Sequence, residues 1–462
     1  MESWRQVSKG LYHRPIGANE RFIKFVGDGA HKAGREQWSV SVTAALKFPA
    51  KITTPDIREA LQCAWKLLRF KHPSIASTVL ETENDHVINY SVPDVESLNS
   101  WVNETFFVID DPGANAEDTI SALKPNEFLT GYYLSHQQEI VIHTAHWRTD
   151  GYGAVYLLDA LLHSIKVVLD NDGLQFVPWG EEVSRLVPSL ETALQLPDSD
   201  PPEALSAAKK YINTQGLMKN SVGIPFLGDL STRPGGTRSV TMQIPEETTQ
   251  ALEAACKEHN LELFPACHAA LAKFHFSQLS HSSEKEKHYS STIRLNMRPH
   301  MLPPYNGPAG ACSIYTGGYR FQVSSSQTFS EISENYLNEY KNSVTDSFIQ
   351  SRRQFAMTII ESLRGGMPTT TPPPSNIDIS IVEKVDKVLS PVLSTGKGPL
   401  EVLNINLGVE TLTRQPYLFL WKFSGRLNLA LWYNEAYQDR EMASDILHDI
   451  YSALITALRP VV

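Results

Sequence analysis

Cysteine is scarce in this sequence, and its few copies are far apart. Cys63, Cys256, Cys267 and Cys312 show no CxxC spacing, which argues against the usual zinc and redox motifs. Small disulfide-stapled secreted proteins carry a much higher density of cysteine. We therefore expect reduced thiols that behave as small buried hydrophobic side chains, in a cytoplasmic protein.

Long apolar runs are also missing. No stretch of about 18 consecutive apolar residues occurs, so we expect no membrane span. The opening residues, MESWRQVS, are not followed by an apolar core of signal-peptide length.

Basic residues are fewer than acidic ones: the sequence has 41 Lys and Arg residues and 51 Asp and Glu residues, which gives a formal net charge of −10. A nucleic-acid surface needs a concentrated basic face, so we expect small-molecule partners and no nucleic acid. A local basic patch for the phosphates of a small ligand is compatible with this balance.

The chain is long enough for two domains. Its 462 residues, 42% hydrophobic and 20% charged, exceed the usual size of a single hydrophobic core. A stretch rich in Pro, Asp and Ser at 197–202 leads into a segment with little periodicity. We expect an N-terminal lobe at 1–196, a connection at 197–236 and a C-terminal lobe at 237–462.

Both halves mix strands and helices. In the first, residues 38–48 and 138–146 have the composition of strands. Helices are expected from Thr54-Pro55 to His72 and over 152–170. In the second, strands are expected at 238–244, 288–295, 310–323, 377–383, 401–409, 416–423 and 426–433, with helices at 245–260, from 265, at 328–363 and at 439–457. The predicted fold class is α/β.

The segment HWRTDG at 146–151 carries the candidate chemistry, and three interpretations compete. His146 could be an ordinary histidine at a strand end, with Asp150 capping the next helix. His143, His146 and Asp150 could bind a metal, but the HxxH spacing on a strand points the two rings to opposite faces. His146 could also be a general base presented by a turn at Asp150-Gly151. The spacing alone does not choose among them.

The segment resembles the HxxxDG motif of the coenzyme A-dependent acyltransferase superfamily, which includes chloramphenicol acetyltransferase, plant BAHD enzymes and peptide-synthetase condensation domains. The likeness extends to the helix that ends in His72-Pro73, to the run RLNMRP at 294–299 and to the C-terminal strands and helix at 416–457. Within the superfamily, the chain is most similar to the fungal trichothecene 15-O-acetyltransferases.

The resemblance implies two chloramphenicol acetyltransferase-like lobes, each a mixed sheet flanked by helices, with a tunnel between them. It makes His146 the catalytic base. It pairs Asp150 with an arginine of the later strand, for which Arg298 fits better than Arg294. Gly151 would let the backbone turn or merely start the helix.

Two further residues of these motifs are candidates for lining the tunnel. They are Trp147, for which packing is the alternative role, and Asn296, which belongs to the NxR element.

The expected reaction is transfer of an acetyl or short acyl group from coenzyme A to a hydroxyl of a small molecule, such as a fungal terpenoid alcohol. Acetyl-coenzyme A is a co-substrate, and no bound cofactor or metal is expected. Two departures from the family's patterns matter: the plant DFGWG element is absent, and Ala145 stands where condensation domains carry a second histidine. The alternatives are an N-acyltransferase, a carrier-protein-dependent condensation enzyme or a non-catalytic scaffold. A monomer is expected.

Overall fold

The computed structural model describes residues 3–81, 86–173, 176–197, 199–279, 286–365 and 373–458. The chain divides into two compact units, each assembled from three separate segments. Unit 1 consists of Met1–Ser199, Asn296–Tyr315 and Asp386–Val409. Unit 2 consists of Asp200–Leu295, Thr316–Val385 and Glu410–Val462.

Unit 1 contains two sheets and most of the helices of the N-terminal half. Its strands are β1 (Arg5–Ser8), β2 (Leu11–Pro15), β3 (Val40–Lys47), β4 (Thr78–Glu81), β5 (His86–Ser91), β6 (Phe106–Ile109), β7 (Thr130–Leu134), β8 (Glu139–Thr144), β13 (Val392–Thr395) and β14 (Gly398–Val409). Its helices are α1 (Ala18–Asp28), α2 (Thr54–Lys71), α3 (Val95–Thr105), α4 (Ala116–Ala122), α5 (Gly151–Asp170), α6 (Leu190–Ala193) and α13 (Val385–Val388), which begins at the last residue of a unit 2 segment.

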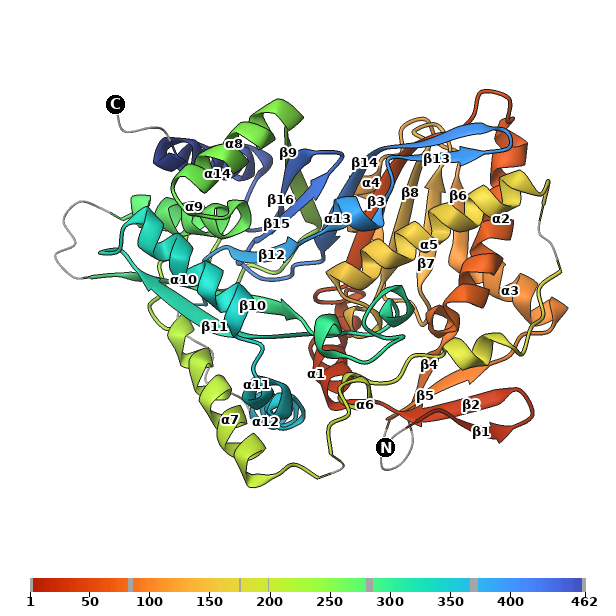
Figure 1. Cartoon of the computed structure of the whole chain (residues 1–462), viewed down its shortest axis with the longest axis horizontal. Coiled ribbons are helices and arrows are strands. Elements are labelled where there is room, and N and C mark those ends of the chain that lie inside the picture. The colour runs from red at the N-terminus through yellow and green to blue at the C-terminus, as the bar shows by residue number, and fades with distance from the viewer. Residues whose placement is uncertain are drawn as a thin grey trace. The chain divides into compact units, whose positions relative to one another are not determined.

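The larger sheet of unit 1 has the strand order β13-β14-β3-β8-β7-β6. The pair β6 and β7 is parallel and the other pairs are antiparallel, so the sheet is mixed. Strand β14 pairs with β3 although more than 350 residues separate them, with Val402 opposite Leu46. In Figure 1 the blue strands β13 and β14 accordingly lie beside the red strand β3.

Helices α2 and α5 pack against each other and lie along this sheet (Figure 1). Helix α5 has the length and mean hydropathy of a membrane-spanning helix, the one such helix in the described part of the chain. However, 61% of its apolar stretch is buried within the fold, as in the core helix of a globular domain.

Unit 2 is a second mixed α/β assembly. Its strands are β9 (Thr237–Ile244), β10 (His288–Asn296), β11 (Thr316–Ser324), β12 (Asp378–Val382), β15 (Tyr417–Phe423) and β16 (Arg426–Asn434). Its helices are α7 (Pro202–Asn213), α8 (Glu246–Glu258), α9 (Leu263–Ser277), α10 (Phe329–Asn342), α11 (Asp346–Gln350), α12 (Arg352–Arg364) and α14 (Arg440–Leu458).

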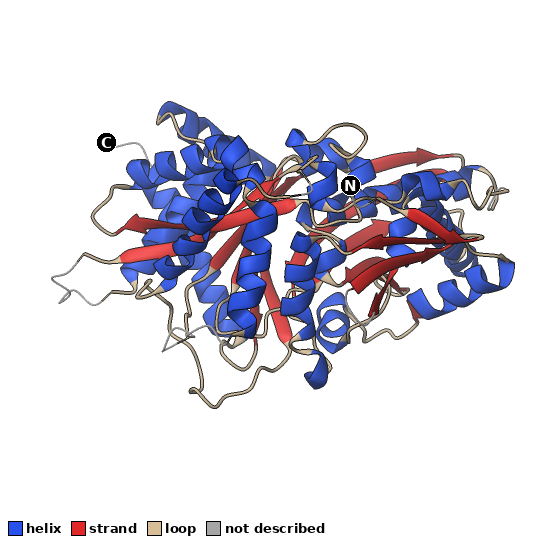
Figure 2. Ribbon diagram, turned by 90° about the horizontal axis from the view of Figure 1, so that it is seen from below, coloured by secondary structure: helices blue, strands red, loops and turns tan. Residues whose placement is uncertain are grey.

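The four-stranded sheet of unit 2 has the order β12-β15-β16-β9, with β12 parallel to β15 and the other pairs antiparallel. Helix α14 packs on α9 and β9, and α10 also packs on α9. Figure 2 shows the blue helices packed along the red strands. The predicted α/β class, with mixed sheets flanked by helices, is confirmed.

Several predicted elements differ from the structure. The helix expected over 328–363 is three helices, because Thr345 adopts an extended conformation and its hydroxyl accepts a hydrogen bond from the Phe348 N–H, which starts α11. The strand expected over 310–323 begins only at Thr316. Residues 202–213, expected to be irregular, form helix α7 with four buried residues on one face.

Candidate active site

His146 lies just beyond the end of β8, in a short 3-10 turn that spans His146–Arg148. Strand β8 ends at Thr144, so the strand predicted to extend to residue 146 was too long. The alternation of side chains along a strand therefore does not determine where the His146 ring points. The turn closes with a hydrogen bond from the Arg148 N–H to the Ala145 carbonyl, at 3.1 Å. His143, within β8, is buried, and burial lowers its pKa to about 4.

One contact fixes the tautomer of His146. Its Nδ1 lies 2.7 Å from the carbonyl oxygen of Thr149. A carbonyl oxygen can only accept a hydrogen bond, so Nδ1 carries the proton in the neutral ring and Nε2 carries the lone pair. The half-buried ring is thereby held with its basic nitrogen at Nε2.

Thr149 ties this turn to a distant segment of the same unit. Its hydroxyl donates a hydrogen bond to the carbonyl oxygen of Ala311, at 2.8 Å. The adjacent thiol of Cys312 is buried, and burial raises its pKa to about 12. A thiol held protonated in this way is a poor nucleophile.

Asp150 is the N-cap of α5 and is 1% exposed. Its Oδ1 accepts a hydrogen bond from the Gly153 N–H and its Oδ2 accepts one from the Tyr315 N–H, each at 2.8 Å. Both oxygens also accept from Nη1 of Arg298, at 3.0 Å. Both carboxylate oxygens therefore hold the backbone N–H groups of Gly153 and Tyr315 and the Arg298 guanidinium in place.

Arg298 is as deeply buried as its partner, at 1% exposure. Its Nη2 donates to the carbonyl of Gly310, at 2.8 Å, and its guanidinium lies 5.3 Å from the centre of the Tyr315 ring. The Oδ1 of Asn296 accepts from the Arg298 backbone N–H at 3.1 Å. Arg294, the weaker candidate, pairs instead with Asp378 in unit 2.

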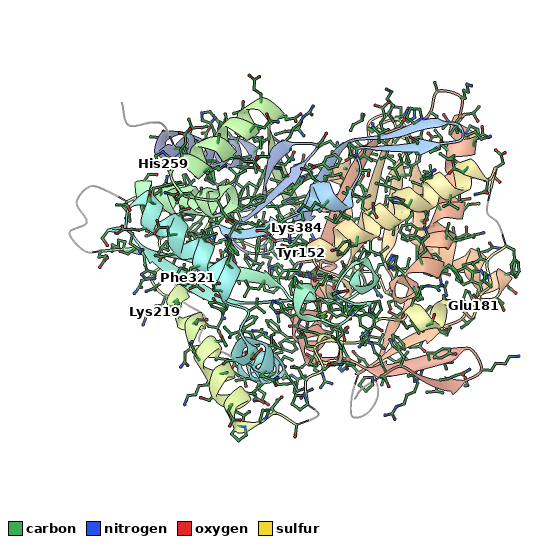
Figure 3. All side chains as sticks on the ribbon, viewed as in Figure 1. Tyr152, Glu181, Lys219, His259, Phe321 and Lys384 are labelled. Carbon is green, nitrogen blue, oxygen red and sulfur yellow. The ribbon has the colours of Figure 1, made fainter. Side chains whose placement is uncertain are left out.

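The structure places the other predicted residues as follows. Gly151 is the first residue of α5, next to Tyr152, which Figure 3 labels. Trp147 is 7% exposed and packs in a small hydrophobic cluster with Ile16, Ile88 and Ala145. This is the packing role that the sequence left open for it.

Arg148 is a structural residue that the sequence did not single out. It is 1% exposed and donates hydrogen bonds to the carbonyl oxygens of Ser74, Ser77 and Glu127 at 2.7–3.0 Å, and to the Thr144 hydroxyl at 3.1 Å. Burial lowers its pKa to about 10. No sequence pattern points to this role, because its partners are mainly backbone carbonyls from other segments.

Gly153 was also missed. A Cβ added there would overlap the carbonyl oxygen of Ala311 and the hydroxyl of Thr149, and would lie 3.2 Å from Arg298 Nη2. The first turn of α5 is therefore pressed against the groups that hold the His146 loop. The second glycine of the HxxxDGxG pattern was the available signal. Glycine inside a helix lowers stability, so its presence in the first turn indicates that a side chain would not fit there.

The metal interpretation of the loop has no geometric support. Among the described residues, the one group with metal-like ligand spacing is Asp28, His31 and Glu36. His143, His146 and Asp150 do not form such a group there.

Full-length relatives carry acetyltransferase names. The acetyltransferase pigO of Monascus ruber is 40% identical over 456 residues, and the match covers 98% of each chain. The O-acetyltransferase pigM of Monascus ruber is 28% identical, with 98% of this chain and 86% of the relative covered. No protein-family model matches the chain.

Solved structures share the fold at low identity. The TRI3 trichothecene 15-O-acetyltransferase of Fusarium sporotrichioides aligns with a TM-score of 0.81 at 17% identity, over 99% of this chain and 98% of that one. The first condensation domain of the calcium-dependent antibiotic synthetase aligns with a TM-score of 0.65 at 11% identity, over 97% of each chain. These structures confirm the two-lobed fold that the sequence resemblance implied. Full-length identity of 40% to a named acetyltransferase, together with this fold, shows that the chain belongs to the coenzyme A-dependent acyltransferase superfamily and is an acetyltransferase.

Proposed function

We propose that His146 is the general base that moves an acetyl group from acetyl-coenzyme A to a hydroxyl group of a small-molecule acceptor. The observation that carries the proposal is the hydrogen bond between His146 Nδ1 and the Thr149 carbonyl, because it leaves the lone pair on Nε2. A base held in a fixed tautomer suits this reaction.

The reaction needs no covalent enzyme intermediate. Nε2 of His146 takes the proton from the acceptor hydroxyl while its oxygen forms a bond to the thioester carbonyl carbon. The tetrahedral intermediate then collapses, the carbon–sulfur bond breaks, and the imidazolium returns its proton to the departing sulfur. The products are the acetyl ester and free coenzyme A.

The acceptor class is proposed from the names of the relatives. PigM is named an O-acetyltransferase, TRI3 acetylates a trichothecene hydroxyl, and a third relative, from Aspergillus terreus, is named for azaphilone biosynthesis and is 28% identical over 326 residues. We propose an alcohol of a fungal secondary metabolite, of azaphilone or terpenoid type, as the acceptor in a ternary complex.

The first prediction tests the base. His146→Ala should reduce kcat for coenzyme A release by about 10²- to 10⁴-fold, with little change in the urea midpoint, because the ring is only half-buried. His163→Ala, at a half-exposed histidine of α5, is the matched control and should keep full turnover. Wild-type turnover in His146→Ala would rule out the base assignment.

The same assay separates the alternatives. A carrier-protein-dependent condensation enzyme should release no coenzyme A from free acetyl-coenzyme A, and a non-catalytic scaffold should release none with any acceptor. An N-acyltransferase would prefer an amine acceptor to the matching alcohol. Ala145, which stands where condensation domains have their second histidine, is 5% exposed and packs with Trp147, and it favours the use of a free thioester.

A further inference from the structure

The segment 310–315 of unit 1 is bonded to the loop that contains His146. The Thr149 hydroxyl donates to the Ala311 carbonyl, and Asp150 accepts from the Tyr315 N–H, each at 2.8 Å. Thr149 also supplies the carbonyl that accepts from Nδ1 of His146. A displacement of segment 310–315 would therefore move the group that orients the imidazole.

Two consecutive residues at the start of α1 hold this segment. Nδ2 of Asn19 donates to the Ile314 carbonyl at 3.0 Å, and Oε1 of Glu20 accepts from the Ser313 hydroxyl at 3.3 Å. Asn19 is 3% exposed, and the other three residues are buried at least as deeply. Hydrogen bonds shielded from water in this way are stronger than exposed ones, so both contacts restrain the segment.

The start of α1 is itself firmly held. Arg14 donates from Nη1 and Nη2 to the two carboxylate oxygens of Glu20, at 2.8 and 2.7 Å. Glu20 Oε2 also accepts from the Gly17 N–H at 2.9 Å, and Glu191 Oε1 accepts from the Asn19 N–H at 2.9 Å. A bidentate arginine–carboxylate pair fixes orientation as well as distance. Glu20 is therefore a rigid support for the segment.

Helix α1 also packs directly on the turn that contains His146. It contacts the 3-10 turn His146–Arg148. In the hydrophobic cluster, Trp147 packs with Ile16, which lies just before α1, and Ile23 of α1 packs against the same cluster. The start of α1 therefore reaches the His146 loop twice, by packing at Trp147 and through segment 310–315.

We propose that Asn19 and Glu20 are positioning residues for acetyl transfer, which act through segment 310–315 on the Thr149 carbonyl that orients His146. Both side chains are buried and bonded to protein groups, so they act through the imidazole and not on the substrate. The proposal rests on the role of His146 as the general base.

Steady-state kinetics of coenzyme A release by the full-length protein test this role. Asn19→Ala removes the bond to Ile314 and adds no charge. It should lower kcat by about tenfold, because a small misplacement of a catalytic group slows the reaction, while the KM for acetyl-coenzyme A should change by less than about twofold. Thr105→Ala is the matched control, since it removes a buried hydroxyl bonded to Trp65 and to the Trp101 carbonyl. It should lower the urea midpoint but keep kcat.

A second background separates positioning from a general loss of structure. In protein that carries His146→Ala, Asn19→Ala should not reduce the residual rate further, because no imidazole is left to position. A smaller folded fraction would lower the rate equally in both backgrounds, and equal losses would overturn the proposal.

Two other outcomes have distinct meanings. Wild-type kcat in Asn19→Ala, together with an inactive His146→Ala, would overturn the positioning role and leave the base assignment intact. Wild-type turnover in His146→Ala would overturn both.

A milder variant carries the test if the first one fails to fold. Ser313→Ala removes only the hydroxyl that donates to Glu20. It should lower kcat by about threefold with an unchanged KM, and the loss should again disappear in the His146→Ala background. Ser164→Ala, at a buried hydroxyl of α5, is the matched control and should keep full turnover. Equal turnover of the two serine variants would contradict the role of Glu20.

Discussion

Asp150 and Arg298 hold the start of α5 in place, directly after the loop that contains His146. Each oxygen of Asp150 accepts a backbone N–H and shares Nη1 of Arg298. Arg298 in turn donates to the Gly310 carbonyl. The pair therefore joins the start of α5 to residues 310–315, and it supports His146 by fixing the segment that contains Thr149.

The second prediction concerns this pair. Asp150→Asn and Arg298→Met should each lower the free energy of unfolding by about 3–5 kcal/mol, because each leaves a buried charge without its partner. The double variant should be hardly worse than either single variant, since both remove one interaction. Urea unfolding of the wild type, the two single variants and the double variant measures the coupling between Asp150 and Arg298. Fully additive losses of unfolding free energy would show that the two residues do not interact.

A surface pair on α5 provides the control for that cycle. Lys166 and Asp170 form an ion pair at 2.5 Å, and both side chains are about one-third exposed. Lys166→Met should cost less than about 1 kcal/mol. A loss as large as that of Arg298→Met would mean that removing any cation from this unit destabilises it.

At the scale of elements, the start of α5 is the most constrained point of the fold. The helix begins directly after Asp150, and its third residue, Gly153, faces the Ala311 carbonyl so closely that no side chain fits. The helix then runs through the core against α2 and β3. A shift of its first turn would move both the cap and the His146 loop.

The third prediction tests this close approach. Gly153→Ala should destabilise the protein by about 1–3 kcal/mol, because the added methyl group overpacks a site bounded by backbone. It should also reduce kcat, since the Thr149 contact to Ala311 would be displaced. Gly216→Ala is the matched control, as a Cβ there meets nothing within 4 Å, and it should be neutral or slightly stabilising. Equal stabilities of the two variants would refute the steric role of Gly153.

The elements that sequence patterns failed to predict have identifiable causes. Helix α7 buries Ala204, Ala207, Ala208 and Tyr211 at helical spacing, but the small alanines and the preceding prolines concealed the pattern. The strand expected from 310 starts only at Thr316, because the N–H of Tyr315 is bonded to Asp150 rather than to a neighbouring strand. Contacts to a remote segment decided that boundary.

At the scale of the whole molecule, burial lowers the pKa of several histidines of the described chain. Among them is the half-buried His72, whose pKa falls to about 4, and three others are buried as neutral groups. They are His143 on β8 and His268 and His275 on α9. Burial lowers the pKa of His143 and His275 to about 4 and that of His268 to about 3, from a usual value of 6.5. The last two sit in aromatic surroundings: His268 stacks on Tyr336 at 3.5 Å, and His275 stacks on Tyr289 at 4.2 Å.

The fourth prediction follows from these three pKa values. Between pH 6.5 and 4 the unfolded chain binds more protons at these sites than the folded chain, so stability falls as the pH falls through this window. Each histidine adds up to about 1.4 kcal/mol per pH unit to the slope. The pKa of His31 is raised, mainly by a hydrogen bond to Glu36. This one residue therefore increases stability as the pH falls, in the opposite direction to the buried histidines.

Urea midpoints measured at pH 7 and at about pH 5.5 test this dependence, at constant ionic strength so that charge screening does not change. A lower midpoint at the acid pH is expected. Equal midpoints at the two values would show that the buried rings are protonated in the folded chain.

Sequence alone determined the class of the fold and the identity of the central loop. Period-two and period-3.6 patterns report which face of an element is buried, and these gave the α/β assignment and most elements, including α2, β9, α8 and α14. The HWRTDG loop and Arg298 were identified from a motif. The spacing of that motif allowed several roles, and resemblance to a family selected one of them.

Tertiary structure decided what those residues touch. The hydrogen bond of the Thr149 hydroxyl to Ala311, the hydrogen bonds of Arg148 to three remote carbonyls, the close approach at Gly153 and the pairing of β14 with β3 all join segments that are far apart in the chain. Local patterns carry no record of such partners. They arise only when packing brings distant backbone groups within hydrogen-bond distance, because each buried donor must then find an acceptor.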